Sequence, residues 1–169
     1  MALANAVGFT PTAGIDASAK MIQTSQASAP NADVQMGKFE ALPWPDQRFD
    51  QVTSIEALYY CPDPAQAFRE IVRVLKPQGR FDMIIDYYAE SEGTGTWDKG
   101  LGFEITRLST QEWVTVAESV GFRNFQSRRI VNPRVGELAQ GWTESVWYPT
   151  QESFRNYLKN GAFWLTAYP

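Results

Sequence analysis

Short apolar segments alternate with amphipathic segments along most of this chain. Residues 12–16 are largely apolar and end in an acid, and residues 18–25 then place Ser, Met and Ile side chains on one helical face. Pro30 and Asn31 interrupt that helix, and residues 33–36 are the next candidate strand. The pattern therefore predicts a strand, a tight turn, a helix and a second strand.

The middle of the chain predicts a second unit of the same kind. Residues 49–55 are rich in β-formers and only partly alternating, which is typical of a central strand covered on both faces. Asp63 followed by Pro64 is typical of a helix start, apolar residues follow with the spacing i, i+3, i+4 and i+7, and the Pro-Gln-Gly of residues 77–79 ends the helix. Residues 80–86 are the next predicted strand. This succession of strand, helix and strand is a βαβ unit, which places the chain in the α/β class.

The last part of the chain is less regular. Glycines punctuate a polar stretch at residues 93–102, which is either an ordered insertion or a flexible flap. Residues 109–112 have the S-x-x-E pattern of a capping box and begin a helix that ends at a glycine. Residues 122–131 and 162–167 are predicted strands, and residues 151–158 form a predicted helix between them.

The length of 169 residues suits one domain, and the composition narrows the chemistry that this domain can carry. Asp and Glu number 19 against 15 Lys and Arg, which gives a net charge of −4 and argues against a broad nucleic-acid surface. The chain has no His and one Cys, so Ser-His-Asp and Cys-His sites, His-ligated zinc and an intrachain disulfide are excluded. Carboxylates, hydroxyls, backbone groups or a cofactor must then supply any chemistry.

Neither a membrane span nor a secretory signal is visible. No apolar run approaches the ~20 residues that a bilayer span needs, and the N-terminus lacks the basic start and long apolar stretch of a signal peptide. The single cysteine, Cys61, has no neighbouring cation, so we interpret it as a buried, inert thiol. We expect a cytoplasmic protein that binds neither membranes nor nucleic acid.

Three motifs carry a resemblance to a known family. They are Gly-Ile-Asp-x-Ser-x-x-Met at residues 14–21, Glu-x-Leu-Pro-x-x-x-x-x-Phe-Asp at residues 40–50 and Leu-Lys-Pro-x-Gly-Arg-Phe at residues 75–81. In this order and at these separations the chain resembles the class I S-adenosylmethionine-dependent methyltransferases, in particular the small-molecule enzymes of the methyltransferase type 11 kind. The resemblance implies a Rossmann-like three-layer sandwich with a mostly parallel sheet and an antiparallel C-terminal strand. It also implies S-adenosylmethionine as cofactor and a small molecule as substrate.

The resemblance places Asp16, Ala17 and Met21 at the cofactor. An acid at the carboxyl end of the second family strand can accept hydrogen bonds from the ribose hydroxyls. The alternative for Asp16 is to cap the helix that follows, and the three motifs together favour the ribose. Met21 either packs on the adenine or belongs to the core, and a lone Met at helical spacing is more often a core residue.

The loop after the third family strand is also expected to contact the adenine. Family members carry an Asp there, just after a Gly, whereas this chain has Gly37 followed by Lys38, Phe39 and Glu40. A Lys cannot accept a hydrogen bond from the adenine amino group, so a backbone group or Glu40 substitutes, or adenine recognition is weakened. A solvent-exposed loop acid is the favoured interpretation of Glu40. Ile55, at the end of its predicted strand, is the last expected cofactor residue.

Three residues are candidates for the substrate side. Glu56 and Tyr59 follow a strand at the sheet edge where α/β proteins bind ligands, so Glu56 is a candidate base and Tyr59 a candidate orienting hydroxyl. An aromatic patch under a loop is the commoner explanation of such residues. Trp147 is a candidate for a lid over a flat or apolar substrate, although core aromatics have the same appearance in a sequence.

One part of the family pattern is missing. Class I methyltransferases have a first strand and a loop of the form E/D-x-G-x-G-x-G ahead of the acid of the second strand, and the residues before Asp16 contain no G-x-G. Residues 1–8 resemble instead the tail of the helix that follows this loop. We therefore expect residues 1–169 to form a single but incomplete, N-terminally truncated domain that lacks the first strand and the loop.

Two consequences are expected from this departure. The neighbours of the missing strand must pair directly, leave a slot or borrow a strand from a second copy, which predicts a homodimer that covers exposed sheet edges. The loop's backbone N–H groups are lost, which predicts weak or absent binding of S-adenosylmethionine. The expected function is a small-molecule methyltransferase impaired by the missing loop; the alternative is a non-catalytic interaction module or truncated gene product.

Overall fold

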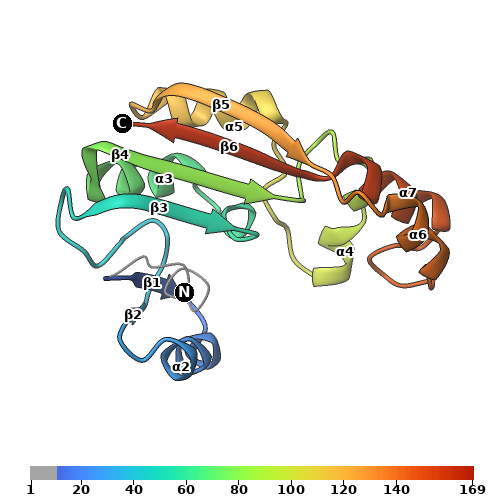
Figure 1. Cartoon of the computed structure of the whole chain (residues 1–169), viewed down its shortest axis with the longest axis horizontal. Helices are drawn as coiled ribbons and strands as arrows, with labels where there is room; N and C mark the ends of the chain where they lie inside the picture. The colour runs from blue at the N-terminus through green and yellow to red at the C-terminus, as the bar shows by residue number, and fades with distance from the viewer. Residues whose placement is uncertain (1–10) are drawn as a thin grey trace.

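The computed structural model describes residues 11–169 (Figure 1), so the interpretation of residues 1–8 lies outside the described part of the chain. The strands are β1 (Ala13–Asp16), β2 (Asp33–Met36), β3 (Phe49–Ile55), β4 (Leu75–Ile85), β5 (Arg123–Ile130) and β6 (Ala162–Tyr168). The α-helices are α2 (Ala19–Ser28), α3 (Pro64–Val74), α4 (Trp97–Leu101), α5 (Thr110–Ser119), α6 (Val135–Leu138) and α7 (Gln151–Asn160). Three 3-10 turns join them, η1 (Leu58–Tyr60), η2 (Glu92–Thr94) and η3 (Ala139–Gly141).

The described strands form two separate sheets. β1 pairs with β2 in parallel, and the larger sheet has the strand order β3-β4-β6-β5. β3 and β4 are parallel, whereas β6 runs antiparallel to both β4 and β5, which confirms the antiparallel C-terminal strand. The arrows of β1, β3 and β4 point the same way in Figure 1, and α4, α6 and α7 lie beyond the carboxyl ends of β3 and β4.

The position of β3 differs from the prediction. Residues 49–55 were expected to form a central strand, but β3 is the outer strand of its sheet and pairs only with β4 among residues 11–169. Its side chains alternate in exposure, and Ile55 is 60% exposed. Within the described residues no hydrogen-bonded strand joins β1 to β3, so their facing edges are both left without a partner.

Local sequence signals account for the main helix boundaries. The Asp63 carboxylate accepts a hydrogen bond from the Gln66 N–H at 2.9 Å and caps α3, while Ser109 and Glu112 form the expected capping box at α5. The predicted end of α3 at residues 77–79 is wrong. Leu75 already has extended backbone angles, so the helix ends one turn earlier and the Pro-Gln-Gly segment lies within β4.

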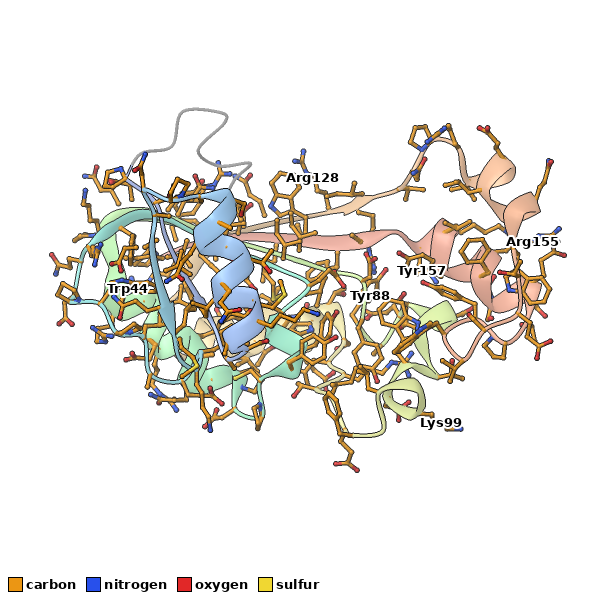
Figure 2. The ribbon with its side chains drawn as sticks, turned by 90° about the horizontal axis from the view of Figure 1, so that it is seen from below. Trp44, Tyr88, Lys99, Arg128, Arg155 and Tyr157 are labelled. Atoms are coloured by element: carbon orange, nitrogen blue, oxygen red, sulfur yellow. The ribbon has the colours of Figure 1, made fainter. Side chains whose placement is uncertain are left out.

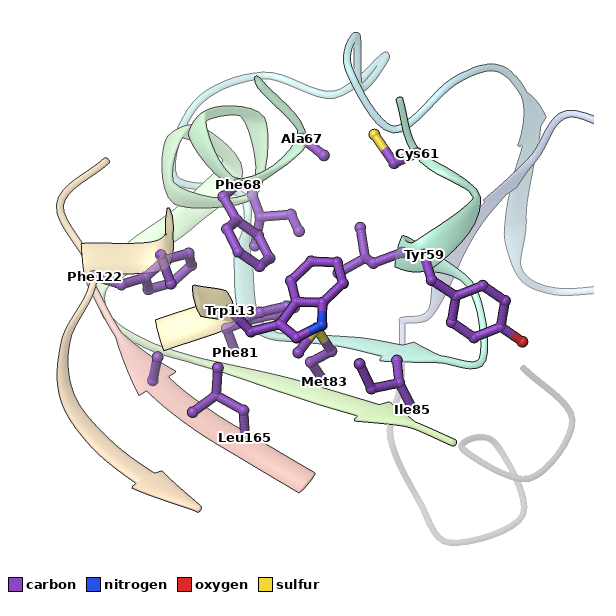
Figure 3. Close-up of a cluster of buried hydrophobic side chains, with 14 of the residues drawn as sticks. Tyr59, Cys61, Ala67, Phe68, Phe81, Met83, Ile85, Trp113, Phe122 and Leu165 are labelled. Carbon is purple, nitrogen blue, oxygen red and sulfur yellow. The ribbon is translucent and has the colours of Figure 1, made fainter. Parts of the chain in front are cut away.

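The hydrophobic core lies between the larger sheet and the helix pair α3 and α5 (Figure 3). Phe81, Met83 and Ile85 point to this side from β4, because alternate residues of a strand share a face, and all three are fully buried. Phe68 of α3 and Trp113 of α5 fill the space above them, with ring centroids 6.0 Å apart. Large aromatic rings each bury roughly 150–250 Å², so this layer carries most of the hydrophobic stabilisation.

The opposite face of the same sheet is polar. Asp82 of β4 is only 1% exposed, and each of its carboxylate oxygens accepts two hydrogen bonds. The donors are Trp164 and Thr166 of β6, Arg80 of β4 and Gln51 of β3. Asp82 therefore joins three strands through one buried charge whose hydrogen-bonding capacity is filled.

Polar contacts hold the smaller sheet to the rest of the chain. Asp33, the first residue of β2, accepts a hydrogen bond from the Trp44 indole at 2.8 Å and forms an ion pair with Arg48 at 2.9 Å. Arg73 of α3 donates to the Leu42 and Trp44 carbonyls at 2.9 and 2.7 Å, which fixes the loop between the two sheets. None of the helices among residues 11–169 is long and apolar enough to cross a membrane.

Candidate active site

The carboxyl ends of β1, β3 and β4 each lead into an acidic residue. Asp16 is the last residue of β1, Glu56 follows Ile55 of β3, and Asp86 follows Ile85 of β4. Parallel strands present their carboxyl ends at one edge, where α/β proteins usually bind ligands. These three acids therefore mark the candidate active site.

Glu56 is held firmly in this position. Its backbone has φ of 52°, in the left-handed region that residues other than glycine seldom adopt, and its N–H donates to the Ile84 carbonyl at 2.9 Å. Its Oε1 oxygen accepts a hydrogen bond from the Asp86 backbone N–H, with 2.6 Å between N and O. Its Oε2 oxygen accepts a hydrogen bond from the Tyr59 hydroxyl, with 3.0 Å between the two oxygens. The sequence showed no pairing between the two candidates Glu56 and Tyr59, whereas the structure joins them by a direct hydrogen bond.

The surroundings of Glu56 favour its neutral form. Burial is the main cause and the negative charge of Asp86 adds to it, so the pKa of Glu56 rises from an ordinary 4.5 to about 7. The hydrogen bonds from Tyr59 and from the Asp86 N–H lower the pKa, but by less. A carboxyl group with a pKa near neutrality can take up or release a proton under physiological conditions, as a general base or acid must.

Asp86 and Tyr157 extend the site. The sequence did not indicate Tyr157. The Tyr157 hydroxyl of α7 donates to Asp86 Oδ2 at 2.7 Å across 71 residues of sequence. Close by, the Tyr88 hydroxyl donates to the Gly161 carbonyl at 2.8 Å, and Figure 2 places Tyr88 and Tyr157 at the end of the sheet away from Trp44. An acid at the end of a predicted strand was a usable signal for Asp86. Nothing local marks Tyr157.

A cluster of aromatic side chains, called here the aromatic cap, covers the end of β4. Its rings come from the segment after β4 and from the segment between β5 and β6. Trp97 lies at its centre, with ring centroids 6.0 Å from Tyr87, 5.8 Å from Tyr157, 6.1 Å from Tyr148 and 6.4 Å from Trp147. The glycine-rich stretch of residues 93–102 contains most of η2 and all of α4 and contributes Trp97 to the cap, and Trp147 belongs to the cap with 37% of its surface exposed.

Two polar atoms inside the cap lack partners. Trp97 Nε1 and Asp98 Oδ1 are buried, and neither has a hydrogen-bond partner among residues 11–169. A buried polar atom without a partner costs roughly 1–3 kcal/mol, so such atoms need a reason to persist.

The first group of predicted cofactor residues lies at the end of β1. Ser18, and not Asp16, is the N-cap of α2, so the capping interpretation of Asp16 is wrong. Asp16 Oδ1 accepts the Ser18 N–H at 2.8 Å, while Oδ2 has no donor among the described residues. Ala17 is exposed beside it. Met21 is 48% exposed on a helix without buried residues, so its interpretation as a core residue is also wrong.

The second group lies after β2 and β3. Lys38 is exposed, and Phe39 packs against the core. Glu40 is half-buried beside Cys61, which corrects its interpretation as an exposed loop acid. Burial raises the pKa of Cys61 to about 12, and Glu40 adds to this effect, so the thiol is inert as expected. Ile55 ends β3 with its side chain largely in solvent.

These residues fit one part of S-adenosylmethionine. Asp16 offers a free carboxylate oxygen for a ribose hydroxyl, and the exposed side chains of Met21, Met36 and Ile55 offer apolar surface for an adenine ring. No glycine-rich loop precedes β1 among the described residues, so they provide no cradle for the methionine end. The fit is therefore to the adenosyl half of the cofactor.

Comparisons with known proteins identify methyltransferases as similar to this chain. Residues 1–83 match the family described as "Methyltransferase domain". An uncharacterized methyltransferase of Bacillus subtilis is 35% identical over 96 residues, which are 52% of this chain and 38% of that protein. The ubiquinone/menaquinone biosynthesis C-methyltransferase of Rickettsia bellii is 27% identical over 143 residues, and this chain spans 46% of its length. The chain therefore spans less than half of each of these relatives.

Solved structures extend the similarity over the whole fold. A Haloferax volcanii putative methyltransferase, solved in complex with the Trm112 methyltransferase activator, matches 99% of this chain and 75% of that chain with a TM-score of 0.86 and 27% identity. An S-adenosylmethionine-dependent methyltransferase from Mesorhizobium loti matches 99% of this chain and 84% of that chain with a TM-score of 0.76 and 16% identity. The family match and the fold agree: the chain is similar to the class I S-adenosylmethionine-dependent methyltransferases and has their Rossmann-like fold.

Proposed function

We propose that the protein transfers a methyl group from S-adenosylmethionine to a small molecule, with the substrate held beside Glu56 under the aromatic cap. The observation that carries this proposal is the placement of Asp16 and of the Glu56–Tyr59 pair. The first acid belongs to the cofactor motif and the pair lies on the expected substrate side, and both follow the carboxyl ends of strands that point the same way in Figure 1. In α/β proteins ligands bind at the carboxyl ends of such strands.

The cofactor, when bound, supplies an electrophilic methyl group. Asp16 would accept a hydrogen bond from a ribose hydroxyl, and the side chains of Met21, Met36 and Ile55 would contact the adenine ring. Lys38 cannot accept a hydrogen bond from the adenine amino group, so that role falls to Glu40 or to the backbone of the same turn. Ala17 and Phe39 lie within these two segments and shape them.

The chain's own residues prepare the substrate. Glu56 takes the proton from the accepting atom of the substrate on its Oε2 oxygen. The Tyr59 hydroxyl donates a hydrogen bond to the same oxygen and thereby orients the Glu56 carboxylate. The aromatic cap, with Trp147 at its surface, excludes water from the accepting atom. Methyl transfer depends mainly on positioning and desolvation, so the lack of His is no obstacle.

Saturation-transfer NMR with S-adenosylmethionine tests the cofactor part of this proposal, because the method detects weak binding. We expect signals from the adenine and ribose protons with the unmodified chain, loss of these signals in Asp16→Ala, and no loss in Asp50→Ala, whose carboxylate is exposed elsewhere. No signal with the unmodified chain, or equal signals in both variants, would reject the cofactor site. Weak binding by residues 1–169 stays a prediction, and micromolar affinity by calorimetry would contradict it.

A second candidate function is a non-catalytic methyltransferase-like interaction module. The observation that favours it is that, among residues 11–169, β1 pairs only with β2 and β3 only with β4, so one edge of each strand can accept a strand from another chain. A stable homodimer without cofactor binding would support this candidate. The homodimer and the cytoplasmic location both stay predictions.

A further inference from the structure

The electrostatics of the site limit the kind of substrate that it can take. Glu56 and Asp86 lie side by side, and neither forms an ion pair with a Lys or Arg in the described part of the chain. The titratable groups that face Glu56 are Tyr59 from η1, Asp86 after β4 and Tyr148 between η3 and α7. Burial raises the pKa of both tyrosines further above their ordinary values, so both are neutral and leave the negative charge uncompensated.

One cation of this region, Arg107, is committed to other partners. Arg107 lies over the Tyr87 ring, with its guanidinium carbon 5.7 Å from the centroid. Its NH2 group donates to the Ala89 carbonyl at 3.3 Å and to the Ser91 carbonyl at 3.4 Å. It therefore does not neutralise Glu56 or Asp86.

The uncharged walls of the site are aromatic. Tyr59 stands 4.6 Å from Tyr60 and 5.6 Å from Tyr87 by ring centroids, and Tyr87 continues to Trp97. Tyr60 is 44% exposed, so part of this wall is open to solvent. Aromatic faces attract cations, and a carboxylate beside them adds direct charge attraction. An anion would be repelled by the same arrangement, and a neutral alcohol or phenol would gain only the stacking.

We propose that the substrate is an organic amine, whose ammonium group binds to Glu56 and Asp86 and whose apolar part lies against the aromatic cap. This inference rests on the proposed function for the fate of the amine, but the binding that it describes needs no cofactor.

Three probes that share a phenethyl group separate the contribution of charge from that of the aromatic ring. Calorimetry without cofactor measures the affinity of phenethylamine, of its neutral isostere 2-phenylethanol, and of phenethyltrimethylammonium, a permanent cation. At about pH 8.5 we expect both cations to bind at least about tenfold more tightly than the alcohol. At about pH 5.5 Glu56 carries a proton while phenethylamine keeps its charge, so we expect this preference to shrink severalfold. Equal affinity of amine and alcohol at both pH values would overturn the proposal.

Variants assign the effect to the named carboxylate. Glu56→Gln keeps an oxygen to accept the Asp86 N–H, and we expect it to lower amine affinity about tenfold with no change for the alcohol. Glu118→Gln removes an exposed acid on α5 and is the matched control that leaves both affinities unchanged. Equal losses in the two variants would show a general charge effect and contradict the proposal. The pH series on the unmodified chain gives the same answer if Glu56→Gln fails to fold.

The outcome is independent of the cofactor experiment. Binding of S-adenosylmethionine without a preference for amines would leave the proposed function standing and overturn the amine substrate. A preference for amines without cofactor binding would support the amine-binding site and overturn the proposed function. If Glu56→Gln weakens cofactor binding and the amine shows no preference over the alcohol, the two carboxylates serve the sulfonium charge, and the amine proposal is wrong.

Discussion

Replacement of Asp82 by Asn tests how the polar face of the larger sheet is held together. The carboxylate is 1% exposed and accepts four hydrogen bonds, two at each oxygen. An Asn of the same size keeps one oxygen, but its amide NH2 group must face two donors instead of accepting from them. The change therefore removes two hydrogen bonds and the negative charge without leaving a cavity.

The size of the effect follows from the partners that are lost. A hydrogen bond to a charged group contributes roughly 1.5–3 kcal/mol, but the Arg80 side chain is 44% exposed, so its share is closer to the ~0–1 kcal/mol of a surface pair. Asp82→Asn also removes the cost of burying a charge, which offsets part of the loss. We expect a loss of about 2–4 kcal/mol in the free energy of unfolding. In a chain of this size that lowers Tm by roughly 5–15 °C.

Urea unfolding followed by circular dichroism measures this loss, with Asp50→Asn as the matched control. The Asp50 carboxylate is 84% exposed and pairs with Lys76 at the surface, so its replacement should cost no more than about 0.5 kcal/mol. If Asp82→Asn costs no more than Asp50→Asn at an unchanged m value, the buried carboxylate does not stabilise the sheet and the reasoning fails.

The same variant has a signature in its pH dependence. Burial raises the pKa of Asp82, but the hydrogen bonds from Thr166, Trp164 and Arg80 together outweigh it and hold the pKa below its ordinary value. The stabilisation is therefore fully present above the unfolded pKa of about 3.9 and is lost as the pH falls through the lower folded value. The difference between the unmodified chain and Asp82→Asn should shrink below about pH 4.

Three further predictions concern the site and its surroundings. The pKa of Glu56 rises to about 7 on folding, so its contribution to the free energy of unfolding is complete below about pH 4.5 and is lost as the pH rises through 7. Glu56→Gln should therefore be more stable relative to the unmodified chain above pH 7 than below pH 4.5. A Tm difference between the two proteins that stays constant from about pH 5 to pH 8.5 would contradict this. Gly93→Ala should lower the free energy of unfolding by roughly 1–3 kcal/mol, because a Cβ there would clash with the Ser153 carbonyl and the Tyr157 backbone in α7, whereas Gly136→Ala, with open space around it, should cost nothing. Similar denaturant midpoints for the two variants would count against close packing of η2 on α7. The Glu56 N–H points to β4, so by alternation the Thr53 N–H points to the other edge of β3, which has no strand partner among residues 11–169. Thr53→Pro should therefore abolish any dimer that sedimentation equilibrium detects while the chain stays folded. A dimer that survives this change is not built on the β3 edge.

Many local features of this protein could be predicted from neighbouring residues alone. Asp63 with Pro64, and Ser109 with Glu112, fixed two helix starts, because a cap is a contact between residues three positions apart. The strand segments and the α/β class followed from periodicity for a similar reason. The motif around Asp16 pointed to the cofactor edge, and the acid after residues 49–55 pointed to Glu56.

Tertiary structure alone decided how these pieces meet. The hydrogen bond between Asp86 and Tyr157 spans 71 residues, and the contacts of Asp82 with β6 span 82 and 84 residues, so no local pattern could reveal them. The proton affinity of Glu56 depends on its burial and on the charge of Asp86, which a strand pairing places beside it. Sequence determined which segments form and which chemical groups they carry. Only long-range packing decided which strand edges stay open and which carboxylate is poised near neutrality, because burial and charge proximity are properties of the folded chain.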